Sequence, residues 1–201
     1  VDATSETQRI AISMIFALAA TVDEKDHYTY GHSRKVSQYA VAMAQQLNLP
    51  SEKIGVIRTA GLLHDIGKIG IPDSILNKDG ILDEQEWRQI RSHPEMGVEI
   101  LRYVAELANS LPIILNHHEH FDGSGYPAGL KGSEIPFEAR LLSIADAYDA
   151  MTSLRPYHNQ RSSQEAIDEL KRCAGTTFDP ELVEIFCKIL QSMVLKPESG
   201  R

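Results

Sequence analysis

Cysteine and aromatic residues are scarce in this chain of 201 residues. Cys173 and Cys187 are its two cysteines, and Phe, Trp and Tyr together make up 6% of the sequence. Two cysteines cannot form the disulfide framework of a small secreted domain, and no Cys/His nucleophile pattern accompanies them. We therefore expect two buried thiols in a cytoplasmic protein.

Positive charge is also scarce. Lysine and arginine number 20 against 28 aspartates and glutamates, which gives a formal net charge of −8. Polymeric nucleic acid is bound through a basic face that neutralises phosphates, so this balance argues against a general nucleic-acid binder. A small anionic ligand stays compatible with it, because bound metal ions can reverse the field locally.

Long hydrophobic runs are missing as well. The most apolar stretch, residues 10–22, falls short of the roughly 20 residues that span a bilayer. No basic segment followed by a cleavage site precedes it, so we predict no secretory signal. We expect residues 1–22 to form a helix that is a linker stub, a dimerisation segment or a helix packed on the domain. The domain itself is expected over residues 23–195, with a tail at 196–201.

Strand patterns are nearly absent, since no alternating run of β-branched residues is long enough for a strand. Apolar residues at helical spacing and helix-start signals recur instead, over residues 31–47, 51–66, 83–90, 94 onward, 112–118, 137–154, 163–172 and 179–190. Ser51 is the expected N-cap of the second helix and Gly67 its stop. Asp83 and Glu86 have the spacing of a capping box. With loops at 70–80 and 121–133, we predict an all-α helical bundle.

Several of the eight histidines stand where a predicted helix begins or ends. Asp65 and Asp146 lie among apolar residues, and a buried, unpaired carboxylate costs several kcal/mol unless a cation meets it. If the helix ends converge on one pocket, they bring together His32, His64, Asp65, His93, His117 and His118, and Asp146 joins them from the middle of a helix. We expect His27, His120 and His158 to be hydrogen-bonded core residues or surface residues.

A pair of divalent metal ions explains these residue types. Two ions about 3.5–4 Å apart need a short bridging carboxylate, and Asp65 can give one oxygen to each. Ligands with nitrogen and oxygen but no sulfur favour iron, manganese, nickel or zinc. Each residue taken alone is more often a hydrogen-bonded or ion-paired structural residue, so the prediction rests on their coincidence. No nucleophile elbow and no phosphate-binding P-loop is present.

Three segments resemble motifs of the HD-GYP family, within the HD superfamily of metal-dependent phosphohydrolases. They are residues 64–72 (HDIGKIGIP), 117–127 (HHEHFDGSGYP) and 144–157 (IADAYDAMTSLRPY). They follow one another in the family's order between about residues 21 and 190. A bare His-Asp pair is weak, whereas three long motifs together are specific.

The resemblance implies an all-helical enzyme that hydrolyses the bacterial second messenger cyclic di-GMP, through a hydroxide held between two ions, to linear pGpG. Its implied metal ligands are His32, His64, Asp65 and Asp146 for one ion, and Asp65, His93, His117 and His118 for the other. Lys68 follows His64 by four residues on the same helix face and is expected to reach a substrate phosphate. Arg155 matches a family position that contacts a phosphate of the dinucleotide. The implied ions are iron or manganese.

Two positions depart from the family pattern. Some members have a glutamate four residues before the first histidine that helps to hold a third metal, and this chain has Tyr28 there. We therefore expect two metals and pGpG as the main product, with further cleavage to GMP left open. His158 stands where relatives often carry a basic side chain, which leaves the preference among cyclic dinucleotides open.

Two other functions stay open at this point. One is a phosphodiesterase for another cyclic dinucleotide such as cyclic GMP-AMP, and the other is a sensing module without turnover. The complete set of ligand residues disfavours the sensor. The segment Gly125-Tyr126-Pro127 is interpreted as a turn that positions Tyr126, or as a contact for a GGDEF-domain partner. A homodimer is a further expectation.

Overall fold

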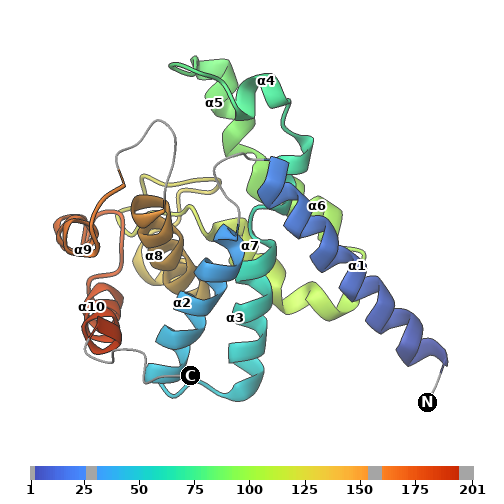
Figure 1. Cartoon of the computed structure of the whole chain (residues 1–201), viewed down its shortest axis with the longest axis horizontal. Helices are drawn as coiled ribbons and strands as arrows, with labels where there is room; N and C mark the ends of the chain where they lie inside the picture. Colours follow the sequence, from blue (N-terminus) through green and yellow to red (C-terminus); the bar gives the residue numbers. More distant parts are fainter. Residues whose placement is uncertain (1–2, 26–30, 154–159, 195–201) are drawn as a thin grey trace.

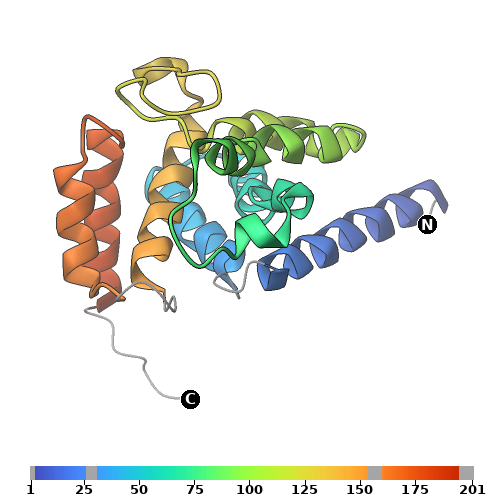
Figure 2. The same ribbon diagram turned by 90° about the horizontal axis from the view of Figure 1, so that it is seen from above.

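The computed structural model describes residues 3–25, 31–153 and 160–194, and the regular elements in this part of the chain are all helices (Figures 1 and 2). The α-helices are α1 (Ala3–Lys25), α2 (His32–Gln46), α3 (Ser51–Leu63), α4 (Asp73–Leu76), α5 (Glu84–Arg91), α6 (His93–Leu101), α7 (Leu111–Asn116), α8 (Phe137–Thr152), α9 (Ser163–Arg172) and α10 (Pro180–Val194). Short 3-10 helices are η1 (Ile66–Gly70), η2 (Ala105–Ser110) and η3 (Gly132–Glu134). Within the described ranges there is no strand, only an isolated bridge between Ala174 and Phe178. The all-α prediction is confirmed.

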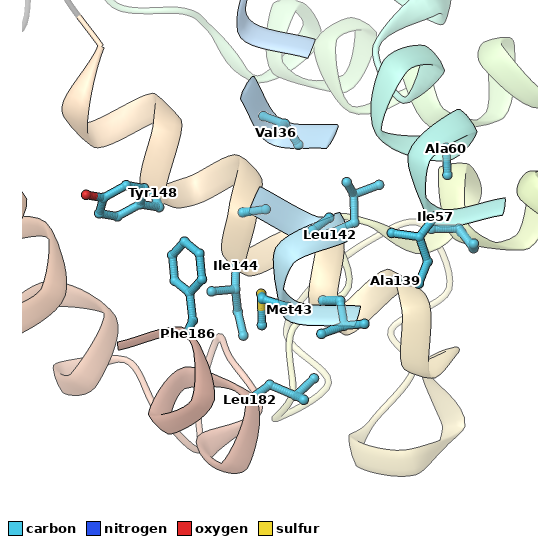
Figure 3. Packing of buried hydrophobic residues seen from close by; sticks show 14 of the residues in the cluster. Val36, Met43, Ile57, Ala60, Ala139, Leu142, Ile144, Tyr148, Leu182 and Phe186 are labelled. Carbon is cyan, nitrogen blue, oxygen red and sulfur yellow. The ribbon is translucent and has the colours of Figure 1, made fainter. Parts of the chain in front are cut away.

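The core lies where α2, α3 and α8 pack together, and α10 packs against α2 and α8 (Figure 3). Met43 of α2, Ile57 of α3 and Leu142 of α8 have no exposed surface. Each such side chain contributes about 1.5–3 kcal/mol by leaving water. Phe186 of α10 meets Tyr148 of α8 edge to face, at 5.2 Å between ring centroids. This apolar body fixes the relative positions of α2, α3 and α8, which carry part of the histidine and aspartate cluster.

The helix start predicted at Asp83 is confirmed, whereas the start and the end predicted for the helix at residues 51–66 and the loop predicted at 70–80 are wrong. Asp83 forms the expected capping box, accepting hydrogen bonds from the backbone N–H of Gln85 and Glu86 at 2.7 and 2.9 Å. Ser51 is the first helical residue rather than the N-cap, a place that Pro50 takes. The α-helix of residues 51–66 ends at Leu63, because the chain tightens into η1, and a one-turn helix, α4, lies inside the predicted loop 70–80.

The first helix meets the domain through its C-terminal half, where Ala19 and Val22 are buried and Ile15 and Phe16 are partly buried against the core (Figure 2). Lys25 Nζ donates hydrogen bonds to the carbonyl oxygens of Ile69 and Ile71, at 3.1 and 2.7 Å. Further toward the N-terminus, the side chain of Met14 is 68% exposed. No helix among the described residues is long and apolar enough to cross a bilayer.

The two thiols differ in exposure. Cys187 is buried, as expected, whereas Cys173 is partly exposed. The expectation of two buried thiols is therefore wrong for Cys173, because this residue follows the last turn of α9 as its C-cap and borders solvent. Both cysteines are free.

Gly67 marks the closest approach of η1 to α6. A Cβ atom at this position would overlap the carbonyl oxygen of His93, and it would lie 2.6 Å from the backbone nitrogen of Gly97. Only a residue without a side chain lets the two backbones meet this closely. The contact holds Asp65, two residues earlier, beside His93.

Replacing Gly67 by alanine is expected to lower the free energy of unfolding by about 1–3 kcal/mol or more, because the new methyl group forces η1 and α6 apart. Gly55→Ala is the matched control. Gly55 also lies in a helical stretch, has open space around its missing Cβ, and should gain up to about 1 kcal/mol in helix propensity. Denaturant unfolding of both variants checks this, and equal stabilities would contradict the close packing.

Candidate metal centre

Seven side chains from five segments of the chain meet beside the core. They are His32 at the start of α2, His64 and Asp65 directly after α3, His93 at the start of α6, His117 and His118 directly after α7, and Asp146 within α8. Three groups have donor atoms within 4.8 Å of one another and could hold a metal ion: His32–His64–Asp146, His93–His117–His118 and His64–Asp65–His117. The structure thus brings together every residue that the sequence analysis placed in the metal site.

The carboxylate of Asp65 lies between the two outer groups. Its Oδ1 is 3.3 Å from Nε2 of His93, and its Oδ2 is 3.5 Å from Nε2 of His64. Oδ2 is also 4.0 Å from Nε2 of His32. One oxygen therefore faces each group, as a carboxylate shared by two cations requires.

Three of the histidines are oriented in the same way. The Nδ1 atoms of His64, His93 and His117 lie 2.9, 2.7 and 2.6 Å from the carbonyl oxygen three residues earlier in the chain. A carbonyl oxygen can only accept, so each Nδ1 carries the proton and donates it. Each Nε2 is then left with its lone pair directed into the cluster, which is the tautomer that a metal ligand needs.

The fourth histidine uses a carboxylate for the same purpose. His32 Nδ1 lies 2.7 Å from Oδ2 of Asp149, whose side chain is almost completely buried. Ser153 Oγ donates a second hydrogen bond to Asp149, at 3.0 Å. His32 Nε2 faces Asp146 Oδ1 at 3.1 Å. The sequence analysis missed Asp149, although its position one helical turn after Asp146 was a usable signal.

Burial and charge set the protonation of the cluster. Burial lowers the pKa of His117 well below its usual range and that of His118 to about 3. Burial alone would raise the pKa of Asp65, but the charge of Lys68 and the surrounding imidazoles outweigh it and hold this pKa well below normal.

Burial alone would also lower the pKa of His32, but its hydrogen bonds to Asp146 and Asp149 raise this pKa to about 10. A cation bound at His32 would therefore displace a proton, whereas His117 and His118 are neutral imidazoles that can bind a cation directly.

One buried atom of the cluster lacks a hydrogen bond. Nε2 of His64 is inaccessible to solvent and has no hydrogen-bond partner among the described residues. A buried polar atom without a partner costs roughly 1–3 kcal/mol, so native proteins rarely leave one. Because Nδ1 of His64 already donates a hydrogen bond to the carbonyl oxygen of Gly61, Nε2 offers its lone pair to a cation. The residues present therefore fit a metal ion.

Lys68 borders the cluster on η1, with Nζ 2.8 Å from Oδ2 of Asp65. The predicted helix face shared with His64 is wrong, because the α-helix ends before both residues. The side chain nevertheless reaches the site, and it is 17% exposed.

The predicted phosphate contact Arg155, together with Tyr28, His27 and His158, lies outside the described residues. His120 lies outside the cluster and is partly buried, with Nδ1 2.9 Å from Ser124 Oγ.

The loop after α7 covers one side of the site. The ring of Tyr126 stacks on that of His118, with centroids 4.9 Å apart and planes 27° apart. Buried Glu119, another residue that the sequence analysis missed, accepts hydrogen bonds from the backbone N–H groups of Ala128, Gly129 and Leu130, at 2.7–3.1 Å. These bonds fix the loop, as expected for a turn that positions Tyr126.

Comparisons with known proteins agree with this geometry. The chain is 40% identical over 167 residues to a cyclic di-GMP phosphodiesterase of Thermotoga maritima, covering 82% of this chain and 45% of that protein. It is 39% identical over 176 residues to 3′3′-cGAMP-specific phosphodiesterase 2 of Vibrio cholerae, covering 86% of this chain and 33% of that protein. The chain thus spans less than half the length of these relatives.

A solved structure shares the fold. The crystal structure of a cyclic GMP-AMP specific phosphodiesterase of Vibrio cholerae superposes with a TM-score of 0.71 at 19% identity, covering 90% of this chain and 48% of that one. A family model described as HD domain matches residues 17–182 of the chain. These findings confirm the resemblance drawn from the three motifs. The chain belongs to the HD domain family.

Proposed function

We propose that the domain is a phosphodiesterase that hydrolyses cyclic di-GMP to linear pGpG with the help of two divalent metal ions. The observation that carries the proposal is the position of Asp65, with one carboxylate oxygen facing His93 and the other facing His64. The relatives named as phosphodiesterases support the reaction class.

The two ions would be held by the residues of the cluster. His32, His64, Asp65 and Asp146 would bind one ion, and Asp65, His93, His117 and His118 the other. When bound, such a pair supplies a water molecule activated near neutral pH and positive charge for the phosphoryl oxygens. Iron or manganese is proposed from the family resemblance, since the nitrogen and oxygen ligands are equally compatible with nickel and zinc. We propose two ions rather than three, because Tyr28 stands where some family members have the glutamate that helps to hold a third metal.

The chain's own cations would stabilise the negative charge that develops on the phosphate. Lys68 brings its ammonium group to the edge of the cluster, within 2.8 Å of Asp65. A positive charge fixed there lowers the energy of the transition state more than that of the ground state. Arg155 is proposed to hold a phosphate of the same substrate.

A second substrate has equal support from the relatives. The relative named for cyclic GMP-AMP is 39% identical to this chain and the one named for cyclic di-GMP is 40% identical. The difference is too small to choose between the bases, so cyclic GMP-AMP is the alternative substrate. A sensing module without turnover is disfavoured, since none of the seven ligand residues is missing.

Two partner proposals use exposed segments. The loop that contains Gly125-Tyr126-Pro127 is the proposed contact for a GGDEF-domain protein, and its neighbours Asp122 and Ser124 are exposed. A homodimer through α1 is supported by the exposed side chain of Met14.

Product analysis tests the function. The metal-loaded protein is incubated anaerobically with cyclic di-GMP and Fe(II) or Mn(II), and the products are separated by chromatography. We expect pGpG to appear, with slow or no formation of GMP.

Asp65→Ala should reduce the rate by more than about a thousandfold, because the carboxylate shared by both ions is lost, while circular dichroism shows a folded helical protein. Full activity of the Asp65→Ala variant would contradict the proposal that Asp65 is shared by two metal ions. If the wild type converted cyclic GMP-AMP but not cyclic di-GMP, cyclic GMP-AMP would replace cyclic di-GMP as the proposed substrate.

Asp149→Asn is expected to lower metal affinity about 10- to 100-fold, because the amide no longer holds His32 as a strong ligand. Equilibrium binding of Mn(II) measures the effect. Asp179→Asn makes the same chemical change at another buried aspartate, one that pairs with Arg140 at 2.6 Å and lies outside the cluster. Its metal affinity should stay unchanged. Equal affinities of the two variants would show that Asp149 does not orient the ligand.

A further inference from the structure

A row of rings and one guanidinium group leads from the histidine cluster to the surface of α5. The ring of Tyr126 stacks on His118, and Cζ of Arg91 lies 5.7 Å from the centroid of the Tyr126 ring. The same Cζ lies 5.7 Å from the centroid of the Trp87 ring. Trp87 is thus connected to a proposed metal ligand through two intervening side chains.

The helix that carries Trp87 and Arg91 leads along the chain to a proposed metal ligand. The two residues are four positions apart and share one face of α5. This helix ends at Arg91, and α6 begins two residues later with His93. Its N-terminus has the capping box of Asp83, and Glu86 pairs with Lys78 at 2.6 Å. Figure 1 shows α5 at the outer edge of the molecule, with α6 next along the chain.

Neither the core nor an ion pair accounts for these two side chains. Trp87 is the only tryptophan of the chain, and its side chain is 46% exposed. Arg91 is exposed and forms no ion pair with any carboxylate in the described ranges. A large aromatic surface beside a cation, at the rim of a polar site, is a typical binding surface for a flat ligand.

We propose that Trp87 and Arg91 form a base-binding subsite, in which the indole of Trp87 stacks on one purine base of the cyclic dinucleotide. The proposal rests on the proposed function and extends it to the bases. Every nucleobase has a π face, so stacking selects purine dinucleotides over small phosphodiesters without distinguishing guanine from adenine. Arg91 keeps the indole in place and adds positive charge beside the ligand.

Tryptophan fluorescence tests this directly, because Trp87 is the sole tryptophan. The metal-loaded protein is titrated with pGpG, the expected product, and separately with ribose 5-phosphate. Saturable quenching by pGpG but not by ribose 5-phosphate is expected. Unchanged fluorescence at pGpG concentrations that inhibit turnover of cyclic di-GMP would overturn the subsite.

Steady-state kinetics give an independent readout. Trp87→Ala should raise KM for cyclic di-GMP about 10-fold with kcat nearly unchanged, a loss of the size found when a stacked base loses its aromatic partner. Trp87→Phe should retain most of the affinity, which guards against a folding defect. Tyr103→Ala is the matched control, since Tyr103 is a 78% exposed aromatic ring beside Arg102, at 4.8 Å, that is no part of the row. Equal KM values for all three variants and wild type would overturn the subsite.

The two proposals fail in different ways. Turnover of cyclic di-GMP by wild type, combined with an unchanged KM in Trp87→Ala, would overturn the base subsite and leave the phosphodiesterase intact. Saturable quenching by pGpG without any turnover would support the base subsite and contradict the proposed function. If pGpG quenches no fluorescence and the protein turns over no cyclic di-GMP, both proposals are overturned.

Discussion

The burial of one carboxylate among imidazole rings is the constraint on which the rest of the site depends. Asp65 is 6% exposed and lies at the meeting point of η1, α6 and α2. An ionised carboxylate taken out of water costs several kcal/mol unless cations and donors surround it. Lys68 supplies one positive charge, and divalent ions held by the histidines would supply more. The fold therefore makes chemical sense when metal is bound.

Hydrogen bonds to carbonyl groups at helix ends orient the imidazole rings. The last carbonyl groups of an α-helix have no partner within the helix. Gly61, Ile90 and Ile114 lie in the last turns of α3, α5 and α7, and each of these carbonyl oxygens accepts the Nδ1–H of the histidine three residues later. One hydrogen bond thus satisfies a free carbonyl group and sets the tautomer of a ligand. This explains why the histidines gather just after helices, where the sequence analysis noticed them.

Much of the fold and of the cluster was predictable from the sequence, because helix signals are local. The capping box at Asp83 and the histidines at helix ends could be read from residue spacing. The end of α3 could not, since it depends on the contact of Gly67 with His93, 26 positions further along the chain. The role of Glu119 was missed because its partners in the loop at 128–130 meet it only once that loop folds back. The position of Asp149 one turn after Asp146 was a usable signal, but its partner His32 is brought to it by tertiary structure. The row from His118 to Trp87 likewise joins two segments, α5 and the loop after α7, that are separated in sequence.

The most direct test of the account is anomalous X-ray diffraction from crystals of the manganese-loaded protein. The account predicts two manganese peaks, one on each side of the Asp65 carboxylate. Nε2 of His64 would face the first peak and Nε2 of His93 the second. A single peak, or two peaks that both leave Asp65 paired only with Lys68, would contradict a carboxylate shared by two metal ions.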